Sequence, residues 1–115
     1  MRLDIRSLGF SLTEGLREHV ERSLVRAFSH GRRDLVEVQV RLSDQNGPRG
    51  GADKRCVARA RFAGDEHVVI ERRHHDLYTA IAQAIETLGQ RSDARRQRVL
   101  RGRRVLPATR AHMAG

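Results

Sequence analysis

The sequence has a single cysteine and no tryptophan. Cys56 cannot form an internal disulfide, and its place in an alternating apolar run indicates a small buried side chain. A second cysteine and the metal-binding motif His-Glu-x-x-His are also missing. The adjacent residues His74 and His75 have poor geometry for chelation. We therefore expect neither a bound metal ion nor a cofactor.

Signs of catalysis are equally scarce. No serine or cysteine lies in a recognisable nucleophile elbow. The glycine-rich stretch from Asp44 to Gly51 lacks the glycine-lysine-serine/threonine ending and the following helix of a phosphate-binding loop, so we interpret it as a flexible connection. We predict that the protein is not an enzyme and has no small-molecule substrate.

Long apolar runs are absent, because the longest aliphatic run is Val68-Val69-Ile70. A membrane-spanning helix needs about 20 apolar residues in succession, and no secretory signal is visible. We therefore expect a soluble, cytoplasmic protein with no membrane partner. A chain of 115 residues is long enough for one compact domain without a disulfide or a metal ion.

Aromatic residues make up only 3% of the chain, and Phe10, Phe28, Phe62 and Tyr78 can all be explained as packing residues. Modules that read single-stranded RNA stack the bases on exposed aromatic side chains. We expect nucleic-acid binding, if present, to depend instead on phosphate contacts and on the shape of folded RNA.

Positive charge is abundant and unevenly placed. The formal net charge is +9, and Lys54 is the only lysine. From Arg91 onward there are eight arginines and one acid, a net charge of +7, whereas the preceding 90 residues carry 15 basic and 13 acidic groups, a net charge of +2. Such basic segments usually bind nucleic acid or an anionic membrane, and this one lacks the bulky apolar face that membrane insertion needs. We expect a domain at residues 1–98 followed by a basic, flexible arm at residues 99–115.

The hydrophobic pattern predicts the order strand, helix, three strands, helix. Strands are expected at residues 2–8, 36–43, 55–62 and 67–71. The first helix is expected to begin at a cap formed by Ser11 or by Thr13 and to end at His30-Gly31. The economical arrangement is an α+β fold in which both helices cover one face of a four-stranded sheet. The other face would meet water or a partner.

The second helix has the clearest pattern in the chain. Asp76 is expected to cap it, and its apolar stripe consists of Leu77, Ile81, Ala84, Ile85 and Leu88. The positions that would continue the stripe are Ser92 and Arg95. Because arginines cannot be packed in a core unpaired, we expect any continuation past Gly89 to extend into water or onto a polyanion.

Two further groups of arginines are candidates for binding an anion. Arg17, Arg22 and Arg26 flank or oppose the apolar stripe of the first helix, and a solvated helix face is the alternative explanation. Arg72 and Arg73 are expected in the connection before the second helix. Cations beside the positive end of a helix dipole are unfavourable unless an anion is present, so this corner is a candidate phosphate site, with a solvated loop as the alternative.

Three motifs resemble the hibernation promoting factor and ribosome-associated inhibitor family. They are Leu-Thr-Glu-Gly-Leu-Arg-Glu-His-Val at residues 12–20, Ala-Gly-Asp at residues 63–65 and Asp-Leu-Tyr-Thr-Ala-Ile at residues 76–81. The order of strands and helices over residues 1–98 is also similar. The resemblance implies a βαβββα fold similar to that of a double-stranded RNA-binding domain.

The resemblance also implies a function without catalysis. The protein would bind the small ribosomal subunit and its ribosomal RNA in the channel for messenger and transfer RNA, and so inhibit translation during stress or stationary phase. The family's basic residues on the two helices would face this RNA. In this chain those positions are Arg17, Arg22 and Arg26, together with Arg91, Arg95, Arg96 and Arg98.

Two departures from the family pattern leave questions open. Members commonly have acidic or neutral residues where this chain has Arg72 and Arg73. Long members carry a second domain that pairs ribosomes, for which this chain is too short, so its effect on ribosome dimers is open. The alternatives are a general RNA-binding chaperone that uses the basic arm, and an interaction module that pairs through its sheet edge.

Overall fold

The elements follow each other in the predicted order, βαβββα. They are β1 (Arg2–Leu8), α1 (Glu14–Ala27), β2 (Leu35–Asp44), β3 (Lys54–Phe62), β4 (Glu66–His74) and α2 (Leu77–Ala114). The computed structural model describes residues 1–29, 34–44 and 53–114. The predicted helix cap at Gly31 and most of the predicted loop before Gly51 lie outside the described residues. The predicted α+β class is confirmed.

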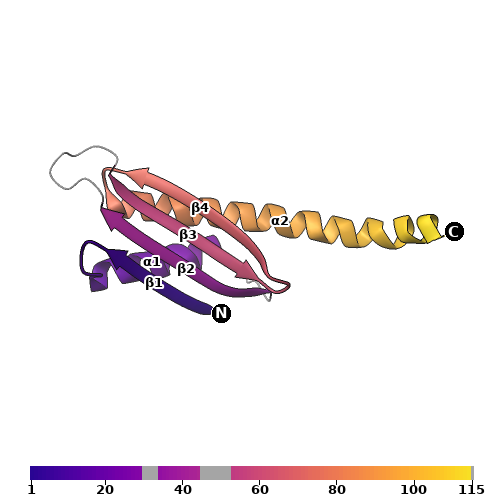
Figure 1. The fold of residues 1–115 in the computed structure, drawn as a ribbon, viewed down its shortest axis with the longest axis horizontal. Coiled ribbons are helices and arrows are strands. Elements are labelled where there is room, and N and C mark those ends of the chain that lie inside the picture. The colour runs from indigo at the N-terminus through magenta and orange to yellow at the C-terminus, as the bar shows by residue number, and fades with distance from the viewer. Residues whose placement is uncertain (30–33, 45–52, 115) are drawn as a thin grey trace.

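The four strands form one sheet in the order β1-β2-β3-β4. β1 runs parallel to β2, whereas β2, β3 and β4 are antiparallel to their neighbours. Parallel neighbours need a crossover connection between them, and α1 provides it. Both helices lie on the same side of the sheet, as predicted, and α2 continues well beyond the sheet's edge (Figure 1).

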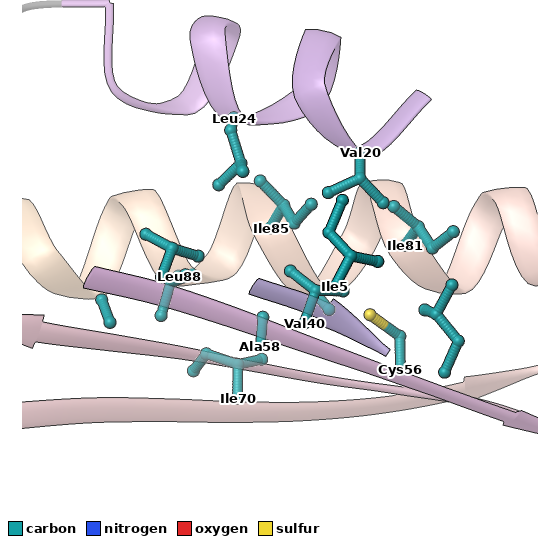
Figure 2. Packing of buried hydrophobic residues seen from close by; sticks show 14 of the residues in the cluster. Ile5, Val20, Leu24, Val40, Cys56, Ala58, Ile70, Ile81, Ile85 and Leu88 are labelled. Atoms are coloured by element: carbon teal, nitrogen blue, oxygen red, sulfur yellow. The ribbon is translucent and has the colours of Figure 1, made fainter. Parts of the chain in front are cut away.

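The core lies between the sheet and the two helices, and Figure 2 shows side chains from β1, β2, β3, β4, α1 and α2 meeting there. On β3 the inward positions are Cys56, Ala58, Ala60 and Phe62, all fully or almost fully buried. The small alanines leave room for the bulky residues of α2 to approach the sheet. Burial also raises the pKa of the Cys56 thiol to about 12, so this cysteine is the inert packing residue that the sequence predicts.

The ends of α1 are set by local contacts. Of the two predicted caps the structure uses Thr13, whose hydroxyl accepts a hydrogen bond from the Leu16 amide at 3.2 Å. The helix ends at Ala27, where Phe28 is the C-cap. The predicted end at His30-Gly31 was therefore too late.

Gly89 lies inside α2 and marks a close approach between the helices. A Cβ atom added there would lie 2.8 Å from the carbonyl oxygen of Ala27 and 2.9 Å from the Ala27 Cβ. Contacts this short do not occur without a shift of the backbone, so the absence of a side chain at Gly89 lets the end of α1 rest against α2. The helix passes through this position and continues to Ala114.

A candidate nucleic-acid interface

The predicted arginines of α1 lie on its solvated side. Arg17, Arg22 and Arg26 are all exposed, and Arg22 pairs with Glu18 one turn earlier at 3.8 Å. The helix contains three glutamates and three arginines, so its own net charge is zero. α1 can therefore place cations against phosphates at particular points, but it does not attract a polyanion through its overall charge.

The predicted arginines of α2 fall into two groups. Arg91, Arg96 and Arg98 are exposed and lie within one turn of Arg95, which contacts the β3–β4 hairpin through Glu66. Arg95 itself is buried, because only 7% of its surface is exposed. Its neighbour on the inner side, Ser92, is fully buried.

Arg95 is held by two carboxylates. Its Nε and Nη2 donate to the two carboxylate oxygens of Glu66 at 3.0 Å each, and its Nη1 donates to Asp34 at 3.1 Å. The guanidinium also stacks 4.2 Å above the centre of the Phe62 ring. Burial alone would lower the pKa of Arg95, but the hydrogen bonds to Glu66 and Asp34 outweigh it and raise that pKa.

Arg95 therefore corrects two sequence predictions. The inner stripe of α2 does not stop at Leu88 but continues through Ser92 to Arg95. Arg95 also does not extend into water, because its guanidinium is buried and paired with Glu66 and Asp34 within the domain. A guanidinium can be buried when carboxylates and an aromatic ring replace its water, and here they do.

The predicted corner before α2 is also different in the structure. β4 extends to His74, so Arg72 and Arg73 are strand residues whose side chains take opposite faces of the sheet. Arg72 reaches toward α2, with Nη2 3.4 Å from the Thr87 hydroxyl. Arg73 lies on the outer face and donates to Glu71 at 3.2 Å. The two arginines do not converge on one anion.

The start of α2 already has a negative group of its own. The Asp76 carboxylate accepts from the Thr79 hydroxyl at 2.7 Å and from the Thr79 amide at 3.3 Å, which confirms the predicted cap. The hydrogen bond from the Thr79 hydroxyl is the main reason why the pKa of Asp76 is lowered. An ionised cap complements the positive end of the helix dipole, so the helix start does not depend on an external phosphate.

The outer face of the sheet carries a large excess of positive charge. The strand register brings together seven outward arginines from the four strands: Arg2, Arg6, Arg41, Arg55, Arg59, Arg61 and Arg73. The carboxylates on this face are Asp4, Glu37 and Glu71, which leaves a net charge of +4. Alternation within each strand could have revealed these positions, but only the register shows that they share one surface. We call this surface the open face.

Within the described residues no three histidine, cysteine, aspartate or glutamate side chains are grouped so that they could hold a metal ion. In the same part of the chain, no helix combines the length and the apolar character needed to cross a membrane.

Comparison with known proteins gives one family and a set of similar folds. Residues 3–99 match the family described as Sigma 54 modulation protein / S30EA ribosomal protein. The N-terminal domain of Thermus thermophilus Protein Y has a TM-score of 0.66 and 23% identity, over 79% of this chain and 94% of that one. A ribosomal subunit interface protein from Coxiella burnetii has a TM-score of 0.66 and 18% identity, over 82% of this chain and 99% of that one. No curated protein sequence matches.

Proposed function

Because the chain belongs to the Sigma 54 modulation protein / S30EA ribosomal protein family, we propose that it is a ribosome-binding hibernation factor of the cytoplasm. In this proposal it binds the small subunit, occupies the channel for messenger and transfer RNA, and inhibits translation by blocking that channel. The family match over residues 3–99 is the observation that carries the proposal. It confirms the relationship that the motifs of the sequence indicated.

The shape and charge of the molecule support this function. It measures 65 × 24 × 19 Å, and α2 extends from the body as a rod (Figure 1). Arg91, Arg96 and Arg98 are exposed where the rod leaves the body. An elongated cationic body can follow a channel lined by phosphates, and arginine forks suit phosphate oxygens.

The side chains on α1 would contribute a second set of contacts. Arg17 and Arg26 are exposed and have no ion-pair partner among the described residues, and the pair between Arg22 and Glu18 is long and solvated. A solvated pair of this kind is worth little, so Arg22 can exchange Glu18 for a phosphate at small cost. We therefore retain Arg17, Arg22 and Arg26 in the proposed interface and leave out Arg95.

Replacing Arg91, Arg96 and Arg98 together by alanine should weaken binding to isolated small subunits without unfolding the protein. Each lost phosphate contact should lower the slope of log affinity against log salt by roughly 0.7–0.9, so the triple variant should lose about 2–3 units of slope. Sedimentation with small subunits through sucrose gradients, at several salt concentrations, measures this slope. The melting temperature should stay close to that of the parent, because these side chains are solvated.

Gln83→Ala is the matched control, since it changes an exposed, uncharged residue of the same helix and should leave the slope unchanged. A triple variant with the parental slope would contradict the proposed contacts. In lysate, a ribosome-binding factor should sediment with ribosomal particles, one molecule per particle. If the parent protein were instead distributed over all RNA in proportion to its phosphate content, it would be a general RNA-binding chaperone.

A further inference from the structure

One end of the open face contains a hollow that is lined by arginines and by no carboxylate. The hollow has a volume of about 430 Å³ and lies between β1, β2 and β3. Its charged lining residues are Arg6, Arg41 and Arg55, and the remaining lining consists of serine and aliphatic residues such as Ser43 and Val57. It lies on the opposite side of the sheet from the two helices.

The strand register at this hollow places like charges opposite each other. Arg6 is the direct neighbour of Arg41 across the β1–β2 pair, and Arg55 is the direct neighbour of Arg73 across the β3–β4 pair. Like charges in directly opposed positions destabilise a sheet. The two opposed arginine pairs at this end of the open face therefore destabilise the sheet, and a bound anion would remove their repulsion.

The carboxylates nearby compensate this charge only in part. Arg6 donates to Asp4 at 3.2 Å, while Arg55 and Arg73 share the single carboxylate of Glu71. The hydrogen bond from Arg55 is the main reason why the pKa of Glu71 is lowered. Arg41 is exposed and has no ion-pair partner within the described residues. Four arginines thus face two carboxylates, which leaves a local net charge of +2.

We propose that this hollow binds a phosphate of an RNA backbone, and that the open face is a second RNA-binding surface in addition to the helices. Arginine forks can each give two hydrogen bonds to one phosphate, and three of them border the hollow. The open face has no phenylalanine, tyrosine or tryptophan on which a base could stack, and its one ring, that of His67, is already engaged by Arg59 and Asp65. The open face would therefore contact the phosphates of the RNA backbone, and this contact would not depend on the RNA sequence.

The distribution of charge favours a polymer over a free phosphate compound. Arg59 and Arg61 lie farther along β3 on the same face, and Arg2 lies at the far end of β1. Alternate residues of a strand are about 6.6 Å apart, so these arginines extend over several phosphate positions. A single nucleotide could contact only a few of them. The domain would then hold RNA on both sides, with α1 and α2 on one and the sheet on the other.

The test is the double variant Arg6→Gln/Arg41→Gln, measured by its affinity for a fluorescent RNA duplex at several salt concentrations. We expect the slope of log affinity against log salt to fall by about 1–2 units as one or two phosphate contacts are lost. We also expect an equal or higher melting temperature, because the variant removes an opposed pair of like charges. A residue that only supported the fold would instead lower the melting temperature.

Arg72→Gln is the matched control, because it removes an arginine that points toward Thr87 on the helix side. It should lower the slope by clearly less than the double variant does. Equal slopes for the double variant and the parent would overturn the inference. Displacement of the duplex by millimolar inorganic phosphate or a mononucleotide, at constant ionic strength, would also overturn it, because the hollow would then be a site for a small phosphate compound.

A ribosome sedimentation assay separates this inference from the proposed function. If the parent protein ignored ribosomes but the double variant lost affinity for the duplex, the proposed function would fail and the hollow would stand as an RNA site. If the parent sedimented with small subunits while the double variant kept the parental slope on the duplex, the inference about the hollow would fail alone.

Discussion

Gly89→Ala is expected to lower the free energy of unfolding by about 1–3 kcal/mol, the usual cost of overpacking. The new Cβ would lie 2.8 Å from the carbonyl oxygen of Ala27, which is a backbone atom and cannot rotate away. The helices would have to separate at the point where α1 ends. This cost exceeds the gain of up to about 1 kcal/mol that alanine normally brings to a helix interior. Urea unfolding followed by circular dichroism measures the change.

Gly15→Ala is the same substitution at a position where the new Cβ meets the end of a side chain and not a backbone atom. Its Cβ would meet the Tyr78 hydroxyl at 3.1 Å, and Tyr78 is exposed, so that side chain can turn aside. The variant should therefore be neutral or stabilised by a few tenths to about 1 kcal/mol. Equal stabilisation by both substitutions would contradict the close approach of α1 and α2 at Gly89.

Arg95→Ala is expected to lower the free energy of unfolding by about 2–3 kcal/mol. The variant loses charge-assisted hydrogen bonds, worth about 1.5–3 kcal/mol each where buried, and a stacking contact with Phe62 worth about 0.5–2 kcal/mol. The total is reduced because the side chains of Asp34 and Glu66 are 40% and 53% exposed, so water can solvate them once the arginine is gone. Thermal and urea unfolding measure the loss.

Arg95→Lys separates the charge of this residue from its shape. Lysine keeps the positive charge but cannot give the forked pair of hydrogen bonds to Glu66, so about half of the loss should remain. At a temperature where both proteins are folded, Arg95→Lys should bind small subunits as the parent does. Weakened binding by folded Arg95→Lys would place Arg95 in the RNA interface after all.

The local pattern of the sequence predicts most of the fold. Apolar residues with a period of two on Val38, Val40 and Leu42, and with helical spacing on Ile81 and Ile85, are all found in the core. β4 was predicted too short for a physical reason. Its inward positions after Ile70 are Arg72 and His74, so the hydrophobic alternation stops although the backbone pairing with β3 continues.

The candidate site was harder to predict, because it depends on contacts between distant residues. Arg95 meets Glu66 and Asp34, which are 29 and 61 positions away in the chain. No local pattern in the sequence shows that these two carboxylates meet at Arg95. An arginine in a basic segment is therefore predicted to be exposed. The open face was not predicted as one surface for the same reason, since the arginines of the four strands come together only when the strands are placed in register.

The arginines of this domain therefore serve different purposes. Arg95 joins α2 to the start of β2 and to the β3–β4 hairpin. Arg91, Arg96 and Arg98 place positive charge on the exposed side of α2. The arginines of the open face place positive charge on the opposite side of the sheet. The proposed function requires Arg91, Arg96 and Arg98 to remain available to RNA while Arg95 holds the helix in place, and the inference about the hollow requires the same of the open face.

Competition for isolated small subunits between this protein and a labelled messenger RNA with its initiator transfer RNA is the most direct measurement. If the protein occupies the channel, each bound molecule should displace one messenger and one transfer RNA, and excess messenger should release the protein in turn. Simultaneous binding of the protein and both RNAs to the same subunits, with no loss of affinity for either, would contradict occupation of the channel.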